Sequence, residues 1–378
     1  MEKSILPKRS HPLVIRFFDV GHGEAVLVQF PDRKTLGIID CHLHLESNRI
    51  SARQISGKEE PKLLSYLRQL RARSPKTEYR VAFICLSHFH DDHFSGMEQL
   101  IAGLRELKIP IEEFWDAGVS PKKVAALAKE GTREAKHQVK QLESLYRELR
   151  IELANGLKKE FLTSARPNFK QYGDVTLELL APHFQHWEDY LQFLQSPNKA
   201  AHAKRNPLSA DENAISSVIL FKYGQATALL TGDIPNEGWQ VLFADKRKKL
   251  ARLHVVKSSH HGSRQGNFMP KKQGSVWKRM TERGKTVAVV SGGYRSALPH
   301  ADTINAITQV GANLYCTGDY RQRLDFDPID QSALPRKVVE ALKDESVPTL
   351  DLNKPLHGDV TAFLFPDGKT NVTTEFKP

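Results

Sequence analysis

The sequence predicts a protein of the α/β or α+β class, and three observations support this prediction. Short runs rich in β-branched and aromatic residues recur along the chain, segments with helical periodicity lie between them, and the runs fall into two groups of similar size. Strands that alternate with helices in this way pack as layers of sheet and helix. We therefore expect residues 1–378 to form a single domain built on two sheet halves.

The first group of strands lies in the N-terminal third of the chain. Turn-forming segments such as DVGHGE and PDRK separate its short apolar runs. Apolar residues spaced three and four apart predict helices over residues 60–73 and 97–107. The strands expected in this group span residues 13–18, 25–30, 36–40 and 81–86.

Residues 120–165 differ in kind from the segments on either side of them. They are charged and helix-favouring, and they contain no strand pattern. Ser120 is a favourable N-cap residue, and Pro121 suits the first position of a helix. The segment therefore predicts a helical insertion within the domain.

The second group of strands follows the insertion. A tight KYGQ turn joins two of its strands, and helical segments are expected over residues 183–207 and after Pro235. The segment LHVVKSSHHGS (253–263) leads from a strand into a turn. The other strands expected here span residues 175–181, 215–221, 226–233, 286–293, 313–318, 360–365 and 371–376.

Composition and charge narrow the class of protein. Hydrophobic residues make up 40% of the chain and charged residues 26%, as in soluble globular proteins. No apolar run approaches the roughly 18 residues that a membrane span needs, and the N-terminus lacks the apolar core of a signal peptide. The three cysteines form no CxxC pair, which is typical of a reducing, cytoplasmic location. The 55 Lys and Arg against 44 Asp and Glu give a net charge of +11, which favours polyanionic partners such as nucleic acid.

The strongest chemical signal is the segment VAFICLSHFHDDHFSG. The buried strand expected over residues 81–86 runs directly into three histidines and two aspartates within six positions, 88–93. Past a strand end, residues two apart can converge on one ion, while the following turn presents others to a second ion. Imidazole nitrogen and carboxylate oxygen suit zinc, manganese or iron. The segment therefore predicts a metal site.

These residues carry a family resemblance. HFHDDH resembles the HxHxDH motif of the metallo-β-lactamase fold superfamily, and the flanking segments are most similar to the hydrolase domain of ComEC-type competence proteins. That group's DVGxGD, TGD, HHGS and later HP segments are similar to DVGHGE, LLTGD, SSHHGS and SALPHAD here. The resemblance covers residues from about 13 to 318. It implies a four-layer αββα sandwich that holds two divalent metal ions, zinc or manganese.

The resemblance also implies roles for individual residues. His88 and His90 would hold one metal, Asp92 and His93 the other, and Asp233 would bridge both. Either His260 or His261 would complete a metal sphere, and we prefer His260 because it comes first after the strand. A carboxylate bridge between two ions a few ångströms apart fits a two-metal centre whose shared hydroxide attacks the substrate.

Other histidines depart from the family pattern. Many members of the superfamily supply a further histidine ligand before the bridging aspartate, for which His183 is the candidate here and His186 the alternative. His22 stands where the family tends to have glutamine, and it could reach the substrate or support a ligand. Residues His42 and His44 form another HxH pair, which we interpret as surface or supporting residues because no DH follows.

Charge and resemblance together predict a phosphodiesterase, most readily a nuclease. Lys257 and Arg264 flank the HHGS motif and could neutralise phosphate oxygens. His300 resembles the histidine of the family's HP segment and could protonate a leaving oxygen, beside the catalytic aspartates 92 and 233. Further candidates for polar residues lining the cleft are Asn213, Ser216 and Ser263.

Two alternatives to a nuclease follow from the same residues. The 120–165 insertion could cover a small cleft for a cyclic nucleotide, ester or lactone, since the fold alone does not choose the substrate. Alternatively, the insertion could dock a partner protein in a multi-protein system, for example as an effector in bacterial defence against phage. An apolar stripe left exposed on the helices of the insertion would favour the partner.

Overall fold

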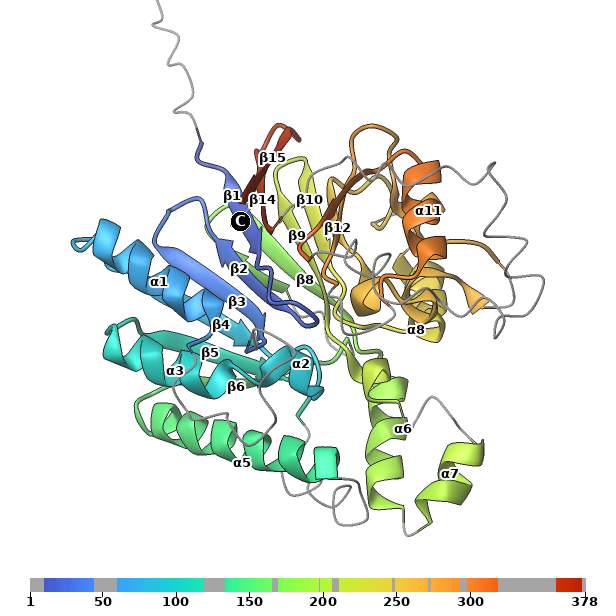
Figure 1. The fold of residues 1–378 in the computed structure, drawn as a ribbon, viewed down its shortest axis with the longest axis horizontal. Helices are drawn as coiled ribbons and strands as arrows, with labels where there is room; N and C mark the ends of the chain where they lie inside the picture. The colour runs from blue at the N-terminus through green and yellow to red at the C-terminus, as the bar shows by residue number, and fades with distance from the viewer. Residues whose placement is uncertain are drawn as a thin grey trace, which may run out of the picture.

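The computed structural model describes ten stretches of the chain. They are residues 10–43, 60–118, 133–164, 169–196, 198–205, 211–246, 249–270, 273–292, 298–318 and 358–375. Two β-sheets pack face to face, and helices cover the outer face of each sheet (Figure 1). This arrangement confirms the predicted fold class.

The first sheet has eight strands. Its N-terminal and C-terminal strands pair in antiparallel fashion, whereas β3, β4, β5 and β6 run parallel. In spatial order the strands are β15 (Thr370–Glu375), β14 (Asp359–Leu364), β1 (Leu13–Phe17), β2 (Ala25–Gln29), β3 (Thr35–Cys41), β4 (Arg80–Cys85), β5 (Ile111–Asp116) and β6 (Lys158–Phe161).

The second sheet has seven strands with a similar division. Strands β10 to β13 run parallel, and β7 to β10 pair in antiparallel fashion. In spatial order the strands are β13 (Asn313–Cys316), β12 (Val287–Val290), β11 (Val255–Lys257), β10 (Ala226–Leu230), β9 (Val218–Tyr223), β8 (Val175–Ala181) and β7 (Phe169–Tyr172).

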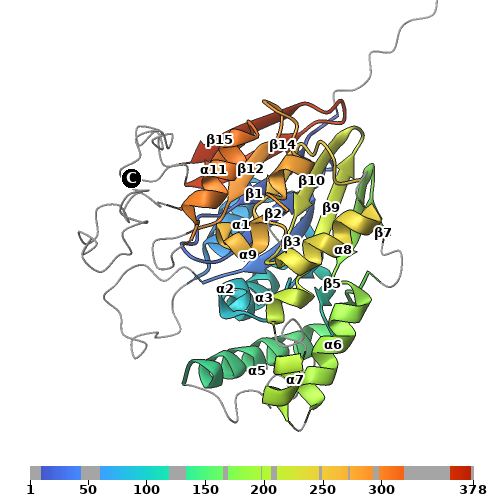
Figure 2. The same cartoon turned by 90° about the vertical axis from the view of Figure 1, so that its right-hand side faces the viewer.

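Three apolar clusters hold these layers together. The alternation of side chains along each strand sends one set inward, such as Ile15 on β1 and Phe221 on β9, into a layer shared by the two sheets. The outer face of the eight-stranded sheet packs against α1 (Lys62–Arg73), α3 (Met97–Glu106), α5 (Arg133–Ala154) and α6 (Phe184–Gln195). The outer face of the seven-stranded sheet packs against α8 (Asn236–Lys246), α10 (Trp277–Met280) and α11 (Ala301–Gln309), and Figure 2 shows α8 and α11 on that side.

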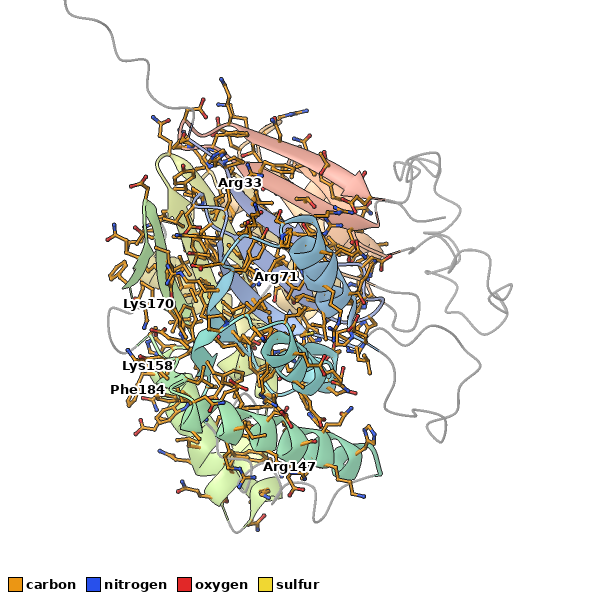
Figure 3. The ribbon with its side chains drawn as sticks, turned by 90° about the vertical axis from the view of Figure 1, so that its left-hand side faces the viewer. Arg33, Arg71, Arg147, Lys158, Lys170 and Phe184 are labelled. Carbon is orange, nitrogen blue, oxygen red and sulfur yellow. The ribbon has the colours of Figure 1, made fainter. Side chains whose placement is uncertain are left out.

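Figure 3 shows the opposite side of the molecule. Arg71 on α1 and Arg147 on α5 mark its helical layer, and Lys158 and Lys170 lie at the edge where the last strands of the two sheets, β6 and β7, meet. The Nζ of Lys170 lies 3.6 Å from an oxygen of Glu160 on β6. Short, charged edge strands of this kind resist pairing with other chains.

The segment predicted as an insertion is only partly helical. Within residues 133–164, α5 is followed by β6, which pairs in parallel with β5. Helix α5 is therefore the crossover that a parallel strand pair requires. The prediction of helix through residue 163 was wrong for β6, because a four-residue edge strand has too few residues to show a period. Strands β5 and β7 were not predicted either, and Ser120 and Pro121 lie outside the described residues.

The helix predicted over residues 183–207 is present as α6 and α7 (Lys199–Arg205). Within the described part of the chain, no helix is long and apolar enough to cross a membrane.

Candidate metal centre

The candidate site lies at one edge of the sandwich, where parallel strands of both sheets end. Asp40 lies near the end of β3, and His88 follows β4 in the first sheet. In the second sheet, Asp233 follows β10, His261 follows β11 and Ser291 follows β12. The carboxyl ends of parallel strands are where side chains from separate strands meet most readily.

The HFHDDH turn (residues 88–93) brings three histidines together. The chain leaves β4 and enters α2 (Asp91–Phe94), which lies at the lower end of the sandwich in Figure 1. The Nε2 of His88 lies 2.9 Å from the Nδ1 of His90, and the rings of His88 and His93 are 4.1 Å apart. The three histidines converge, but His93 groups with His88 and not with Asp92 as predicted, and His90 belongs to none of the compact donor groups.

Two carboxylates link this turn to the SSHHGS turn (residues 258–263) of the second sheet. The Oδ2 of Asp233 lies 3.4 Å from the Nε2 of His93 and 3.4 Å from the Nε2 of His261. The Oδ2 of Asp92 lies 3.1 Å from the Nε2 of His261 and 3.5 Å from the Nε2 of His22. Asp233 thus stands between the two turns.

Among the described residues, three groups of donor atoms are compact enough to hold a metal ion. They are His22/Asp92/His261, His88/His93/Asp233 and Glu24/Asp40/His93. The buried Nε2 atoms of His93 and His261 have no well-directed hydrogen-bond partner. Buried polar atoms are rarely left unsatisfied, and imidazole and carboxylate are common ligands of zinc and manganese. The residues therefore fit divalent cations.

The SSHHGS turn places His261, and not the preferred His260, between the carboxylates. Both residues have left-handed backbones, with φ of 48° and 49° in η3 (Ser259–Gly262). These conformations turn the chain after β11, so counting residues from the end of the strand gives the wrong histidine. The Nδ1 of His261 lies 2.9 Å from the carbonyl oxygen of Ser291 and donates to it, which leaves Nε2 directed at Asp92 and Asp233.

Asp40, near the end of β3, supports His93. Sequence reasoning missed this role of Asp40. The Oδ2 of Asp40 accepts from the Nδ1 of His93 at 2.7 Å and from the hydroxyl of Ser87 at 2.6 Å. The backbone N–H of Ser87 donates to the Oδ1 of Asp40 at 2.8 Å. Asp40 is fully buried and has a left-handed backbone with φ of 56°, which is uncommon outside functional sites. The signal in the sequence was a carboxylate at the end of an apolar strand.

The carboxylate of Asp233 is held by its own turn. The backbone N–H of Asp233 donates to the Oγ of Ser216 at 3.2 Å. Gly232 has φ of +48°, and a Cβ there would lie 3.1 Å from the carbonyl oxygen of Ser217. Ser216 was predicted to line the cleft, but it is fully buried and instead fixes Asp233.

The charges of the site are strongly coupled. Burial opposes ionisation of Asp233, but His261 and His93 outweigh burial and hold the pKa of Asp233 well below its ordinary value. Burial also opposes a charge on His261, but Asp233 and Asp92 outweigh it and raise the pKa of His261 to about 9. In contrast, burial and the neighbouring histidines lower the pKa of His88 well below its ordinary value.

The two basic residues predicted to bind phosphate both have acidic partners. Lys257 is fully buried and is paired with Glu24, so it does not face a cleft. The Nε of Arg264 lies 2.6 Å from the Oδ2 of Asp302, and both side chains are more than half exposed. The structure therefore revises the predicted role of Lys257 and leaves Arg264 on the surface beside the SSHHGS turn.

The remaining polar candidates lie around that turn and around His90. The Nδ1 of His300 accepts from the backbone N–H of Arg264 at 3.1 Å, and the Oγ of Ser263 accepts from the N–H of Gln265 at 3.3 Å. Asn213 is buried in η2 (Glu212–Ile215), and its Oδ1 has no hydrogen-bond partner.

A carboxylate next to Asn213 was missed by sequence reasoning. An oxygen of Glu212 lies 3.4 Å from the Nε2 of His90. Because the Nδ1 of His90 faces His88, Glu212 is placed to orient the His90 ring from its far side. No motif marked this residue.

The additional histidines belong to none of the compact donor groups. His183 is the N-cap of α6, and its Nδ1 accepts from the backbone N–H of Gln185 at 3.3 Å. Its ring lies 5.7 Å from that of His186. His42 belongs to none of these groups and lies 2.9 Å from the hydroxyl of Ser95 through its Nδ1. The structure therefore assigns no ligand role to His183, and His44 lies outside the described residues.

Comparison with known proteins yields similarities of structure only. No protein-family model matches the chain, and no curated protein matches it. The chain is similar to Zn²⁺-bound PqqB from Methylobacterium extorquens. The sequence identity is 11% and the TM-score is 0.39, over 78% of this chain and 85% of that chain.

Two further solved structures show the same level of similarity. The metallo-β-lactamase fold protein YhfI from Bacillus subtilis has 12% identity and a TM-score of 0.41, over 80% of this chain and 96% of that chain. Unliganded yeast PDE1 has 10% identity and a TM-score of 0.39, over 81% of this chain and 98% of that chain. At these values the similarities carry no argument about activity.

Proposed function

We propose that the protein is a metal-dependent phosphodiesterase with a two-metal centre, and that its substrate is nucleic acid. One observation carries this proposal: a single oxygen of Asp233 faces the Nε2 atoms of both His93 and His261, which come from turns on different sheets. A carboxylate shared between two donor sets is the arrangement that a two-metal centre needs.

The proposal follows the two compact donor groups. His88, His93 and Asp233 would hold one ion, and His22, Asp92 and His261 the other. His90, with its Nδ1 2.9 Å from the Nε2 of His88, would support the first ion. Divalent ions bound here supply Lewis acidity and lower the pKa of water, which makes a nucleophile available near neutral pH.

Two residues beside the donor groups have supporting roles: one orients a ligand and the other faces the substrate. Asp40 fixes the tautomer of His93 by accepting from its Nδ1. The Nδ1 of His300 accepts a backbone hydrogen bond, so the neutral ring carries its proton on Nε2. We assign His300 as a hydrogen-bond donor, through its Nε2–H, to a phosphate oxygen of the substrate.

The choice of nucleic acid rests on charge. The chain carries a net charge of +11, which favours association with a polyanion. Arg264, exposed beside the SSHHGS turn, is the cation placed to meet a phosphate chain that approaches the site. A direct cleavage assay tests this substrate class.

The test combines metal analysis with a cleavage assay. Purified protein is analysed for bound metal and then given single- and double-stranded DNA and RNA with added Mn²⁺ or Zn²⁺. We expect about two metal ions per chain, and cleavage that is lost in Asp92→Ala. Bound metal without polymer cleavage, combined with hydrolysis of a small phosphodiester or ester, would replace nucleic acid by a small substrate. A protein that binds no metal would overturn the proposal.

A partner protein on residues 120–165 has less support. Leu142, Leu145 and Leu149 of α5 are buried in the core shared with α3, while Ile151 and Leu153 near the end of the helix are about two-fifths exposed. The described part of the segment therefore uses most of its apolar stripe inside the molecule. Cytoplasmic action against phage nucleic acid stays a proposal, which a plaque assay with wild-type and Asp92→Ala protein tests.

A further inference from the structure

We propose that Lys257 is a positioning residue for the metal centre: its buried ammonium group, anchored by Glu24, fixes Asp233 so that one carboxylate oxygen is reserved for the metal ions. The inference rests on the proposed function, because it assigns a role within the same centre. Lys257 thus acts on Asp233 and not, as predicted from the sequence, on the phosphate oxygens of a substrate.

The surroundings of Lys257 leave no room for a substrate role. Lys257 has no exposed surface, and Glu24 is only 2% exposed. The ammonium group donates to a carboxylate oxygen of Glu24 and to the carbonyl oxygen of Gly232, the latter at 3.1 Å. A buried charge is stable only when paired and hydrogen-bonded, and Lys257 meets both conditions without a ligand.

The same ammonium group lies against the bridging carboxylate. Its Nζ is 3.6 Å from the Oδ1 of Asp233, while the Oδ2 of Asp233 faces His93 and His261 at 3.4 Å. The two oxygens of Asp233 therefore have different surroundings, one facing a cation that belongs to the protein and the other facing the metal-binding histidines. This division leaves Oδ2 as the oxygen of Asp233 that would serve both metal ions.

Lys257 also holds the turn that carries Asp233. The carbonyl oxygen of Gly232 accepts from Lys257, and the backbone N–H of Asp233 donates to Ser216 at 3.2 Å. The residue is therefore fixed on the side of its backbone N–H, at the preceding carbonyl and at Oδ1. Ligands held to within a fraction of an ångström in this way bind metal more tightly than mobile ones.

Glu24 completes the arrangement by anchoring Lys257. Its backbone N–H donates to the carbonyl oxygen of Asp92 at 2.9 Å, which ties the DVGHGE segment to α2. Glu24, Asp40 and His93 also form a third compact group of possible ligands. Because its charge is matched by Lys257, Glu24 is kept as a partner of the lysine and does not compete for the metal ions.

The test removes the ion pair without leaving a buried charge. The variant Glu24→Gln/Lys257→Met keeps the approximate shape of both side chains. The control variant Glu178→Gln/Lys249→Met makes the same chemical change in an ion pair away from the centre, between Glu178 on β8 and the exposed Lys249. Mn²⁺ affinity is measured by calorimetry on metal-free protein, and the visible spectrum of the Co²⁺-loaded protein reports ligand geometry. Circular dichroism establishes that each variant is folded.

We expect the Glu24→Gln/Lys257→Met variant to bind Mn²⁺ about 10–100-fold more weakly than wild type, with an altered Co²⁺ spectrum. The control variant should match wild type in both. Wild-type affinity and an unchanged spectrum in the first variant would overturn the inference and make the ion pair purely structural. Absence of metal from the wild-type protein would overturn the proposed function instead, so the two failures are distinguishable.

A second measurement keeps the inference testable if that variant does not fold. In a crystal structure of the Mn²⁺-loaded wild-type protein, we expect Lys257 to remain at the Oδ1 of Asp233 with metal on Oδ2. Coordination of metal through both oxygens of Asp233, with Lys257 turned away, would contradict it.

Discussion

The HFHDDH turn and the SSHHGS turn each follow a buried parallel strand and each supply the metal centre, but they do so differently. The first turn provides several donors: Asp92 and His93 lie on the short helix α2, and His88 precedes it. His93 lies with His88 and not, as its spacing predicts, with Asp92. The second turn provides one donor, His261, and reaches it through two left-handed residues.

The difference teaches how much each turn depends on its surroundings. A helical turn sets the directions of its side chains by its own regular geometry. Two consecutive left-handed residues, at roughly 1–2 kcal/mol each, persist only when neighbouring groups hold them. Here Gly232 accepts from the backbone N–H of His260, and Ser291 accepts from the ring of His261.

The largest expected effect separates the two neighbouring histidines of the second turn. We expect His261→Ala to weaken Mn²⁺ binding by more than about 100-fold, since even changes behind a ligand weaken binding by 10–100-fold. His260→Ala, the matched control, should change affinity by less than about fivefold. Calorimetric titration of both metal-free variants measures the contrast, and a larger loss for His260→Ala would reverse the assignment.

A smaller effect is expected behind the first turn. Asp40→Asn keeps the size of the side chain but removes the charge that accepts from the Nδ1 of His93. We expect Mn²⁺ affinity to fall about 10–100-fold while the protein remains folded. Asp32→Asn, at an exposed turn remote from the centre, serves as the control, and equal affinities of the two variants would remove Asp40 from the supporting role.

The protonation states of the two turns give a prediction for pH. In the metal-free protein His261 has a pKa raised to about 9 and is protonated at neutral pH, whereas the lowered pKa of His88 keeps that ring neutral. Burial opposes a charge on His93 as well, but Asp233 and Asp40 outweigh it and hold the pKa of His93 well above its ordinary value. Metal needs neutral rings, so Mn²⁺ affinity should rise with pH from neutral pH to at least about pH 9, by about tenfold per pH unit for each proton displaced.

Calorimetry in buffers of different ionisation enthalpy counts the protons released on binding. We expect release at pH 7 in the wild-type protein and at least one proton fewer in His261→Ala. Metal binding without proton release at pH 7 in the wild type would contradict the predicted charge on His261.

The smallest effect is expected at the surface beside the second turn. The Arg264–Asp302 pair is more than half exposed, and pairs of this kind contribute about 0–1 kcal/mol. We expect Arg264→Ala to change the KM for an oligonucleotide by less than about fivefold and to leave kcat unchanged. Asp302→Ala is the matched control, and a fall in kcat for Arg264→Ala alone would place the guanidinium in the reaction.

Much of the site could be predicted from sequence because its residues stand next to one another in the chain. The donors of residues 88–93 follow a recognisable strand, and TGD marks Asp233 as a turn residue after another strand. Asp40, Ser87 and Glu212 could not be predicted, because their roles come from contacts with residues distant in sequence: Asp40 lies 53 positions from His93 and 47 from Ser87. The strand β6 was missed because its pairing with β5, and not its own pattern, makes it a strand.

The sequence by itself determined the two-sheet α/β class and the metal-binding character of residues 88–93, since apolar periodicity and ligand spacing are local properties of the chain. Only the tertiary structure decided which neighbouring histidine faces the centre, and that Lys257 meets Glu24 and Asp233. Charge in a sequence shows how many cations exist, but burial and partners decide what each of them does. Those depend on packing between segments that lie up to 233 positions apart, as Glu24 and Lys257 do.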